Sequence, residues 1–357
     1  MVGSPTRVGN PIHPRLETLM KVFRACSMAV LVSGMVGCAP ETPTSSQSSL
    51  SMSSLASKMS FSSTWSRAMS IELAPPGANR NFNTAFLDGC PAPSRDGKLF
   101  FIASTRPNGK GGRDIWVSAR ASQSEPWGEP TLVGEPISTA SNDFCPMLAS
   151  DGETFYFVSD RPLGCGGTDM YVSHRNTDGS FTAPQNLGCD VNSAANEEGP
   201  VPGNEPKNGR VLYFASSRPG GYAAEAIGAA SDFDLYVSKW RGGAFEAPEL
   251  VPGVNSIAQD GQPFLSDDSR ELYFYSDRTP GGFGGNDIWV ASRDKAKDAW
   301  GAPANLGETV NSPAPETRPS LSSDGTHLYF GSTRAAPAGE GMTDVYVSTR
   351  TRVKGSK

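Results

Sequence analysis

The sequence predicts an all-β protein built from five copies of one four-stranded unit. A motif of about 55 residues recurs along the chain, and the proline that opens each copy stands at Pro91, Pro146, Pro200, Pro263 and Pro319. Glycine (39 residues) and proline (29 residues) are abundant, as the many turns of such a protein require. A fixed period of this size indicates a stacked or circular array. Four short strands per copy, repeated radially, predict a five-bladed β-propeller.

Within each unit, the first strand follows the opening proline, as in 263–266. A two-residue turn then leads into an apolar, aromatic second strand. The turn is Asp-Gly or Asn-Gly in copies 1, 2, 3 and 5, which is a strong hairpin signal. In copy 4 the turn is Asp268-Ser269. The second strands are predicted at 99–103, 154–158, 211–215, 272–275 and 328–331.

The third strands each follow a glycine-rich loop and an aspartate. They are predicted at 115–118, 170–173, 235–238, 288–292 and 345–348. A fourth strand follows an aromatic residue and a proline in the first four copies, for example Trp300 and Pro303. The fifth copy stops after its third strand.

The missing fourth strand of the last blade is expected from the N-terminal side of the repeats. Residues 65–68 and Ile71–Leu73 resemble an orphan fourth strand. Pairing it with 345–348 would close the ring and remove exposed edges. An open solenoid is the alternative, but it needs polar terminal caps, and the sequence shows none. We therefore predict a propeller over residues 65–350, followed by a basic tail at 351–357.

The N-terminal region has the pattern of an export signal. Lys21 and Arg24 precede a short apolar run that ends Met35-Val36-Gly37-Cys38. This ending resembles the lipobox of bacterial lipoproteins, in which the cysteine is lipidated. We interpret 1–37 as the leader, with a true start at Met20 as one possibility, and expect Cys38 to be lipidated; an ordinary cleaved signal is the alternative. Ala39, rather than aspartate, favours the outer membrane.

Composition and charge indicate how the segment before the repeats is organised and which kinds of partner are expected. Residues 38–64 are rich in Ser and Thr and are expected to form a flexible tether. The formal net charge of −6 and the lack of a basic face argue against nucleic acid as a partner. No apolar run is long enough to span a bilayer, so membrane contact is expected through the lipid anchor alone. We expect a monomer in the cell envelope, facing the periplasm or the cell surface.

Four cysteines fall within the repeats, at Cys90, Cys145, Cys165 and Cys189. An exported domain permits disulfides, and four cysteines allow three pairings that the sequence does not resolve. They lack zinc-site spacing, and His174 and His327 are the only histidines beyond the leader. We assign no metal site and expect no cofactor.

The repeat also resembles a known family. The order Val-Asn-Ser, acid, Pro, Asp-Gly, Tyr-Phe-Ser-Asp-Arg, Gly-Gly, Asp-Ile-Trp is similar to the WD40-like periplasmic propeller repeats, which are related to TolB-type propellers. The resemblance covers about 65–350. It implies an envelope protein that binds other envelope components, usually without catalysis.

Polar residues recur at fixed positions, and most fall where the second-to-third loops and the interblade links share one face. An acid lies three residues before each opening proline, an arginine ends each second strand, and an aspartate opens each third strand. We interpret the arginines and strand-opening aspartates as structural partners of each other. The interblade acids are the candidate binding residues, expected to form a negative funnel at the channel mouth for a cation or a basic segment: Asp88, Asp143, Glu197, Asp260 and Glu316.

Two functions are compatible with this pattern. The first is a non-catalytic binding or scaffold lipoprotein for a protein, peptide or glycan of the envelope. The alternative is a glycoside hydrolase with carboxylates at the channel mouth, which needs a proton donor and a second carboxylate in different environments. The near-equivalence of the acids favours the first. Only the third copy breaks the symmetry, with Glu197-Glu198 and a longer loop at 220–231.

Overall fold

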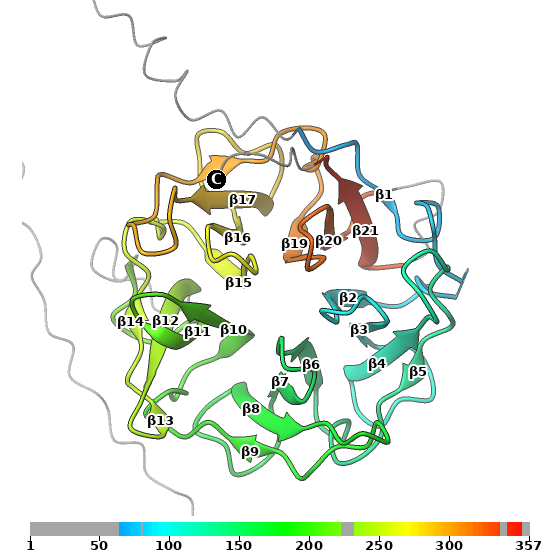
Figure 1. Ribbon diagram of the computed structural model, residues 1–357, viewed down its shortest axis with the longest axis horizontal. Coiled ribbons are helices and arrows are strands. Elements are labelled where there is room, and N and C mark those ends of the chain that lie inside the picture. The colour runs from blue at the N-terminus through cyan, green and yellow to red at the C-terminus, as the bar shows by residue number, and fades with distance from the viewer. Residues whose placement is uncertain (1–63, 80, 223–231, 336–340, 352–357) are drawn as a thin grey trace, which may run out of the picture. The chain divides into compact units, whose positions relative to one another are not determined.

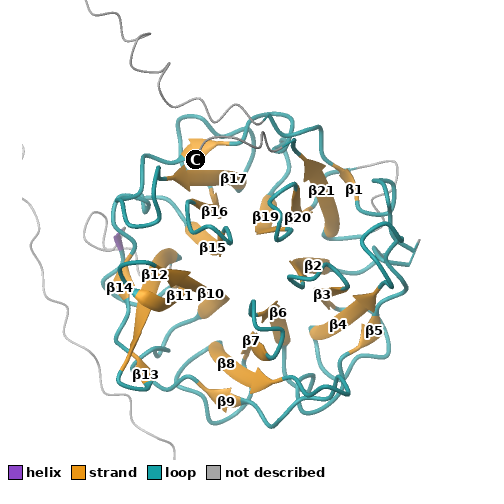
Figure 2. Cartoon of the chain, in the orientation of Figure 1, coloured by secondary structure: helices purple, strands orange, loops and turns teal. Residues whose placement is uncertain are grey.

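The computed structural model describes residues 64–79, 81–222, 232–335 and 341–351. The predicted leader, Cys38, the tether before residue 64 and the basic tail after residue 351 lie outside these ranges. Five antiparallel sheets stand around a central axis, confirming the five-bladed propeller (Figure 1). The named elements of the described chain are all β-strands, joined by turns and loops (Figure 2).

The first strand of each blade lies next to the central axis (Figure 1). These innermost strands are β2 (Asp88–Pro93), β6 (Asp143–Leu148), β10 (Glu197–Glu205), β15 (Asp260–Leu265) and β19 (Glu316–Leu321). The second strands are β3 (Leu99–Ser104), β7 (Thr154–Ser159), β11 (Gly209–Ser216), β16 (Glu271–Ser276) and β20 (His327–Ser332).

The third and fourth strands lie further from the axis. The third strands are β4 (Asp114–Ala119), β8 (Asp169–His174), β12 (Asp234–Arg241), β17 (Asp287–Ser292) and β21 (Asp344–Thr349). The fourth strands are short: β5 (Thr131–Leu132), β9 (Gln185–Asn186), β14 (Glu249–Leu250), β18 (Ala304–Asn305) and, in the last blade, β1 (Met69–Ser70). Blade 3 adds β13 (Ala244–Phe245), which pairs with the end of β12.

The innermost strands begin three residues earlier than the sequence indicates, at the interblade acid. Between the acid and the proline, one residue in each blade has a positive φ, and the innermost strand shifts register there, as in blades 1, 2, 4 and 5. The β10–β11 pair shifts at the same place. Such a bulge hides the strand pattern, because two residues face one partner. The five positive-φ residues are Cys90, Cys145, Gly199, Gln262 and Arg318.

The core consists of apolar layers between neighbouring blades. Second-strand aromatics from adjacent blades pack directly: the rings of Phe101 and Phe155 are 5.0 Å apart, and those of Phe100 and Tyr329 are 4.9 Å apart. Both phenylalanines of blade 1 are at most 1% exposed. Burying such side chains supplies the main driving force for folding, at about 25 cal/mol per Å² of apolar surface.

The N-terminal segment closes the ring, as predicted, but in a slightly earlier register. Met69 and Ser70 pair with Val347 and Tyr346 of β21, and Ile71 donates one more hydrogen bond to Val345. Leu73, expected in the strand, is 63% exposed. The chain therefore leaves β21 soon after residue 71.

Two disulfides resolve the pairing that the sequence left open. Cys90–Cys145 joins the innermost strands of blades 1 and 2, and Cys165–Cys189 joins the β7–β8 loop to the link before blade 3. No helix among the described residues is long and apolar enough to cross a membrane.

Each blade presents two ends. We call the end with the first-to-second strand turns the turn face, and the end with the second-to-third loops and interblade links the loop face. On the loop face, each loop packs on a link: a Cβ added to Gly111, Gly166, Gly284 or Gly341 would lie within 2.6 Å of link backbone atoms. Glycine is therefore required where these loops cross the links.

Candidate active site

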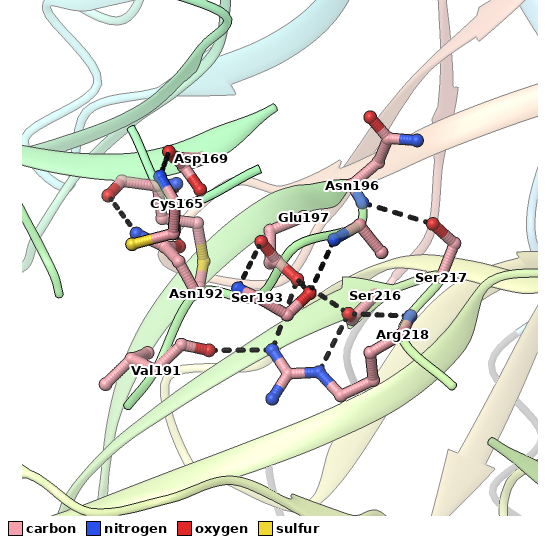
Figure 3. A network of polar contacts seen from close by, with 12 residues as sticks. Cys165, Asp169, Val191, Asn192, Ser193, Asn196, Glu197, Ser216, Ser217 and Arg218 are labelled. Carbon is pink, nitrogen blue, oxygen red and sulfur yellow. Dashed lines mark hydrogen bonds and ion pairs between the residues drawn. The ribbon is translucent and has the colours of Figure 1, made fainter. Parts of the chain in front are cut away.

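The five interblade acids are buried inside the blades. Asp88, Asp143, Glu197, Asp260 and Glu316 are each 0% exposed, and each forms an ion pair with the arginine that follows its own second strand. In blade 3, Arg218 Nη2 lies 3.2 Å from Glu197 Oε1, and Ser216 and Ser193 donate hydroxyl hydrogen bonds to the same carboxylate (Figure 3). Such fully paired carboxylates fix the link to the blade.

The negative funnel predicted for the channel mouth is therefore not formed by these five side chains. The charged groups that act on the buried Tyr275 hydroxyl are Glu198, Arg318, Asp277 and Asp260, and those that act on the Arg318 guanidinium include Glu198 and Arg113. Burial lowers the pKa of the Arg318 guanidinium, and Glu198 acts in the opposite direction. The prediction of a negative funnel was wrong because each acid is neutralised by an arginine of its own blade, and the sequence does not indicate this pairing. A binding role for the five acids stays a prediction.

The sequence also assigned the arginines to the wrong partners. Among the described residues, Asp114, Asp169, Asp234 and Asp287 form no ion pair with the arginines that end the second strands. They accept hydrogen bonds from backbone N–H groups of the glycine-rich loops, such as Cys165 to Asp169 at 2.5 Å and Tyr222 to Asp234 at 2.8 Å. Burial raises the pKa of Asp234 to about 6. The loop thus wraps its own aspartate, while the arginine reaches back to the interblade acid.

Residues that recur in every blade stabilise the blades, whereas a single functional site is expected where one blade differs from the others. On the turn face, blade 3 departs most: β10 and β11 have nine and eight residues, whereas their counterparts have six. The longer hairpin projects past its neighbours on this face.

A cavity of about 530 Å³ lies beside this hairpin. Its walls come from the turns of blades 2 and 4, the β10–β11 hairpin and the turn of blade 1, and its polar side chains are Arg95, Ser150, Asp151, Thr154, Tyr156, Asn204, Arg210, Ser266, Asp267 and Ser269. A second cavity of about 500 Å³ shares Arg95, Ser150 and Asp151 with it. Ligand pockets have this size and this mixture of polar groups. We refer to the first as the turn-face cavity.

Two aspartates from different blades line the turn-face cavity. Asp151 accepts hydrogen bonds from the Thr154 hydroxyl at 2.7 Å and from two backbone N–H groups. Burial alone would raise the pKa of Asp151, but these hydrogen bonds outweigh it and lower the pKa. Asp267 is partly exposed and lies 3.8 Å from Arg95 of blade 1. The cavity thus holds one carboxylate with a lowered pKa and a second that faces an arginine of another blade.

The sequence singled out Asp151 only as a turn residue and missed Arg95, Arg210 and Asp267. A signal existed in the repeat itself. Arg95 and Asp267 occupy equivalent positions that carry serine in blades 2 and 5 and lysine in blade 3, so Asp267 is the one acid at this position. Among the described residues, no group of three or more His, Cys, Asp or Glu side chains is arranged to hold a metal ion.

Comparisons with known proteins agree with the fold. In sequence, the chain matches no protein-family profile and no curated protein. In structure, it is similar to an α-L-arabinofuranosidase from Lactobacillus brevis, with a TM-score of 0.51 and 11% sequence identity. The similarity covers 76% of this chain and 92% of the arabinofuranosidase. A xylan β-1,4-xylosidase from Bacillus halodurans C-125 gives a TM-score of 0.50 at 13% identity, over 78% of this chain and 55% of the xylosidase.

A putative TolB from Agrobacterium tumefaciens is also similar, with a TM-score of 0.45 and 17% sequence identity. The similarity covers 82% of this chain and 100% of the TolB chain. At these identities, the comparisons establish the five-bladed propeller and no particular activity.

The main functional prediction from the sequence, a non-catalytic envelope scaffold, is corrected by these comparisons. The solved structures that resemble the chain include several glycoside hydrolases, which agree better with the alternative prediction. The prediction failed because it examined only the five equivalent acids. Of the two carboxylates that line the turn-face cavity at the opposite face, Asp267 has no acidic counterpart at the equivalent positions of the other blades.

Proposed function

We propose that the protein is a glycoside hydrolase whose active site is the turn-face cavity. The observation that carries this proposal is the pair Asp151 and Asp267, which come from blades 2 and 4 and line one cavity large enough for sugar residues. Glycoside hydrolases generally use two carboxyl groups that flank the scissile bond. The glycosidases similar in fold are consistent with the proposal.

The environments of the two aspartates suit different roles. Asp151 is kept ionised by its hydrogen bonds and is assigned as the base that accepts a proton from the attacking water. Asp267 is assigned as the acid. A sugar bound over it would exclude water, and such desolvation raises a carboxyl pKa. The water oxygen bonds to the anomeric carbon, the glycosidic C–O bond breaks, and the departing oxygen takes the proton of Asp267.

The test is hydrolysis of a panel of aryl glycosides, with aryl glucuronides and galacturonides among them, and of arabinan and xylan. We expect Asp151→Asn and Asp267→Asn each to lower kcat/KM by roughly 100-fold or more, the usual range for losing an acid or base. Asp324→Asn is the matched control, because Asp324 occupies the equivalent turn of blade 5, likewise accepts hydrogen bonds from a threonine hydroxyl and a backbone N–H, and does not line the turn-face cavity. The proposal fails if the wild type cleaves nothing in the panel, or if both variants match the control.

We also propose that the repeats belong to the WD40-like periplasmic family and that Cys38 anchors the protein in the bacterial envelope. The motive is the lipobox-like run that ends Gly37-Cys38, with Ala39 after it. Cys38→Ser should move the protein from the membrane fraction to the soluble fraction of fractionated cells. A variant that stays with the membranes as the parent does would contradict the lipid anchor.

A further inference from the structure

Arg210 departs from an arrangement that three other blades share. In blades 1, 4 and 5, the arginine just after the third strand stacks on a tryptophan at 3.8–4.5 Å and donates its Nε–H to a carbonyl of the first turn. These arginines are Arg120, Arg293 and Arg350. Blade 3 has Trp240 at this position. Its arginine stands instead at the start of the second strand, as Arg210, where it has a different environment.

The guanidinium of Arg210 is held in place from two sides. Its Cζ lies 4.5 Å from the ring centre of Trp240 and 5.4 Å from that of Phe245, and its Nη2 donates a 2.6 Å hydrogen bond to the Tyr156 hydroxyl of blade 2. Tyr156 is itself fully buried. A guanidinium fixed in this way has already lost side-chain entropy, so less is lost when it binds a ligand.

Arg210 lines the turn-face cavity without a carboxylate of its own. Within the described chain, no Asp or Glu oxygen lies within 4.0 Å of it, whereas Arg293 and Arg350 pair with Glu205 and Glu271 at 2.6 Å. Asp151 is near enough for Arg210 to lower its pKa, but its oxygens are bonded to Thr154 and to backbone N–H groups. A planar fork of N–H donors therefore remains available to a ligand.

We propose that Arg210 binds the carboxylate of a uronic acid residue, so that the turn-face cavity takes acidic glycans rather than neutral ones. This inference rests on the proposed function. The arginine fork matches a carboxylate in a bidentate geometry. Asn204 and Asp267 line the same cavity and offer partners for sugar hydroxyl groups. A neutral sugar would satisfy the hydroxyl partners but leave the arginine fork without an anion.

The test is direct binding, measured by titration calorimetry, of glucuronate and galacturonate against glucose and galactose. The wild type should bind the uronates at least tenfold more tightly than the neutral sugars, since hydrogen bonds to charged groups are the stronger ones. Arg210→Gln should remove this preference, and Tyr156→Phe, which keeps the arginine but not its anchor, should reduce it. Arg270→Gln is the matched control, because Arg270 is the equivalent residue of blade 4 and does not line the cavity. Melting curves show whether each variant is folded.

Equal affinity for acidic and neutral sugars, or a preference that survives in both Arg210→Gln and Tyr156→Phe, would overturn this inference and leave the hydrolase proposal standing. If no sugar of either class binds, the inference fails together with the site. Hydrolysis of neutral glycosides that Arg210→Gln leaves unchanged would likewise reject only the uronate assignment.

Discussion

Asp143 illustrates how a charge is accommodated inside a blade. Its carboxylate is 0% exposed and accepts hydrogen bonds from Arg161, Ser159 and Thr139 at 2.6–2.8 Å. A buried ion is tolerated only when its partners replace the water it has lost. The pair therefore contributes less than its attraction suggests, and the loss of one member costs more than the loss of both.

We expect Arg161→Gln to lower the free energy of unfolding by roughly 3–5 kcal/mol, because it leaves Asp143 charged and buried without its cation. The double variant Asp143→Asn/Arg161→Gln should lose clearly less than the sum of the two single losses. Urea denaturation of the four proteins measures both effects.

Lys239→Gln provides the comparison for that cycle. Lys239 and Glu249 are also 2.8 Å apart, but they lie at the surface, where removal of such a pair costs at most about 1 kcal/mol. Losses of equal size at Arg161 and Lys239, or additive losses in the double variant, would mean that the interblade acids are not structural partners of the arginines.

Among the elements, the two-residue strand β1 has an effect beyond its length. It covers the outer edge of β21, and the same segment supplies Trp65 and Ile71, which are 7% and 2% exposed. Arg350 stacks on Trp65 at 4.5 Å and pairs with Glu271 of blade 4. Trp65 also packs edge-on against Tyr273 of blade 4, with ring centres 6.3 Å apart, so the N-terminal segment contacts blade 4 as well as the last blade.

A chain that begins at Ser63 should melt close to the temperature of a chain that begins at Cys38, because both contain the closing segment. A chain that begins at Ala74 loses β1, Trp65 and Ile71, and large buried side chains each contribute about 2–5 kcal/mol. We expect its melting temperature to fall sharply in calorimetry. If the Ser63 and Ala74 chains melted alike, closure by this segment would be wrong.

At the scale of the whole molecule, the ring brings together residues that are far apart in the sequence. Arg95, Asp151, Arg210 and Asp267 come from four successive blades and meet only because the turns point toward one mouth of the channel. The loop face carries the repeated ion pairs, and the turn face carries the cavity with the unrepeated carboxylate of Asp267. Architecture and the proposed chemistry therefore lie at opposite ends of the channel.

The period of the repeat was enough to predict the number of blades, the strand order, the turns and closure by the N-terminal segment. These features depend on local patterns: Asp-Gly at a left-handed turn, apolar alternation in a strand, and an aromatic before the last strand. The start of each innermost strand at the interblade acid was not predicted, because a bulge interrupts the alternation of buried and exposed residues.

Tertiary structure alone decided which charges meet. The sequence contains two acids and one arginine per blade at recurring positions, and nothing in that pattern indicates which acid the arginine reaches. That choice depends on how the chain folds back between blades and on the burial of each carboxylate. The same holds for the turn-face cavity. Its walls come from residues 95 to 269, which only the closed ring places side by side.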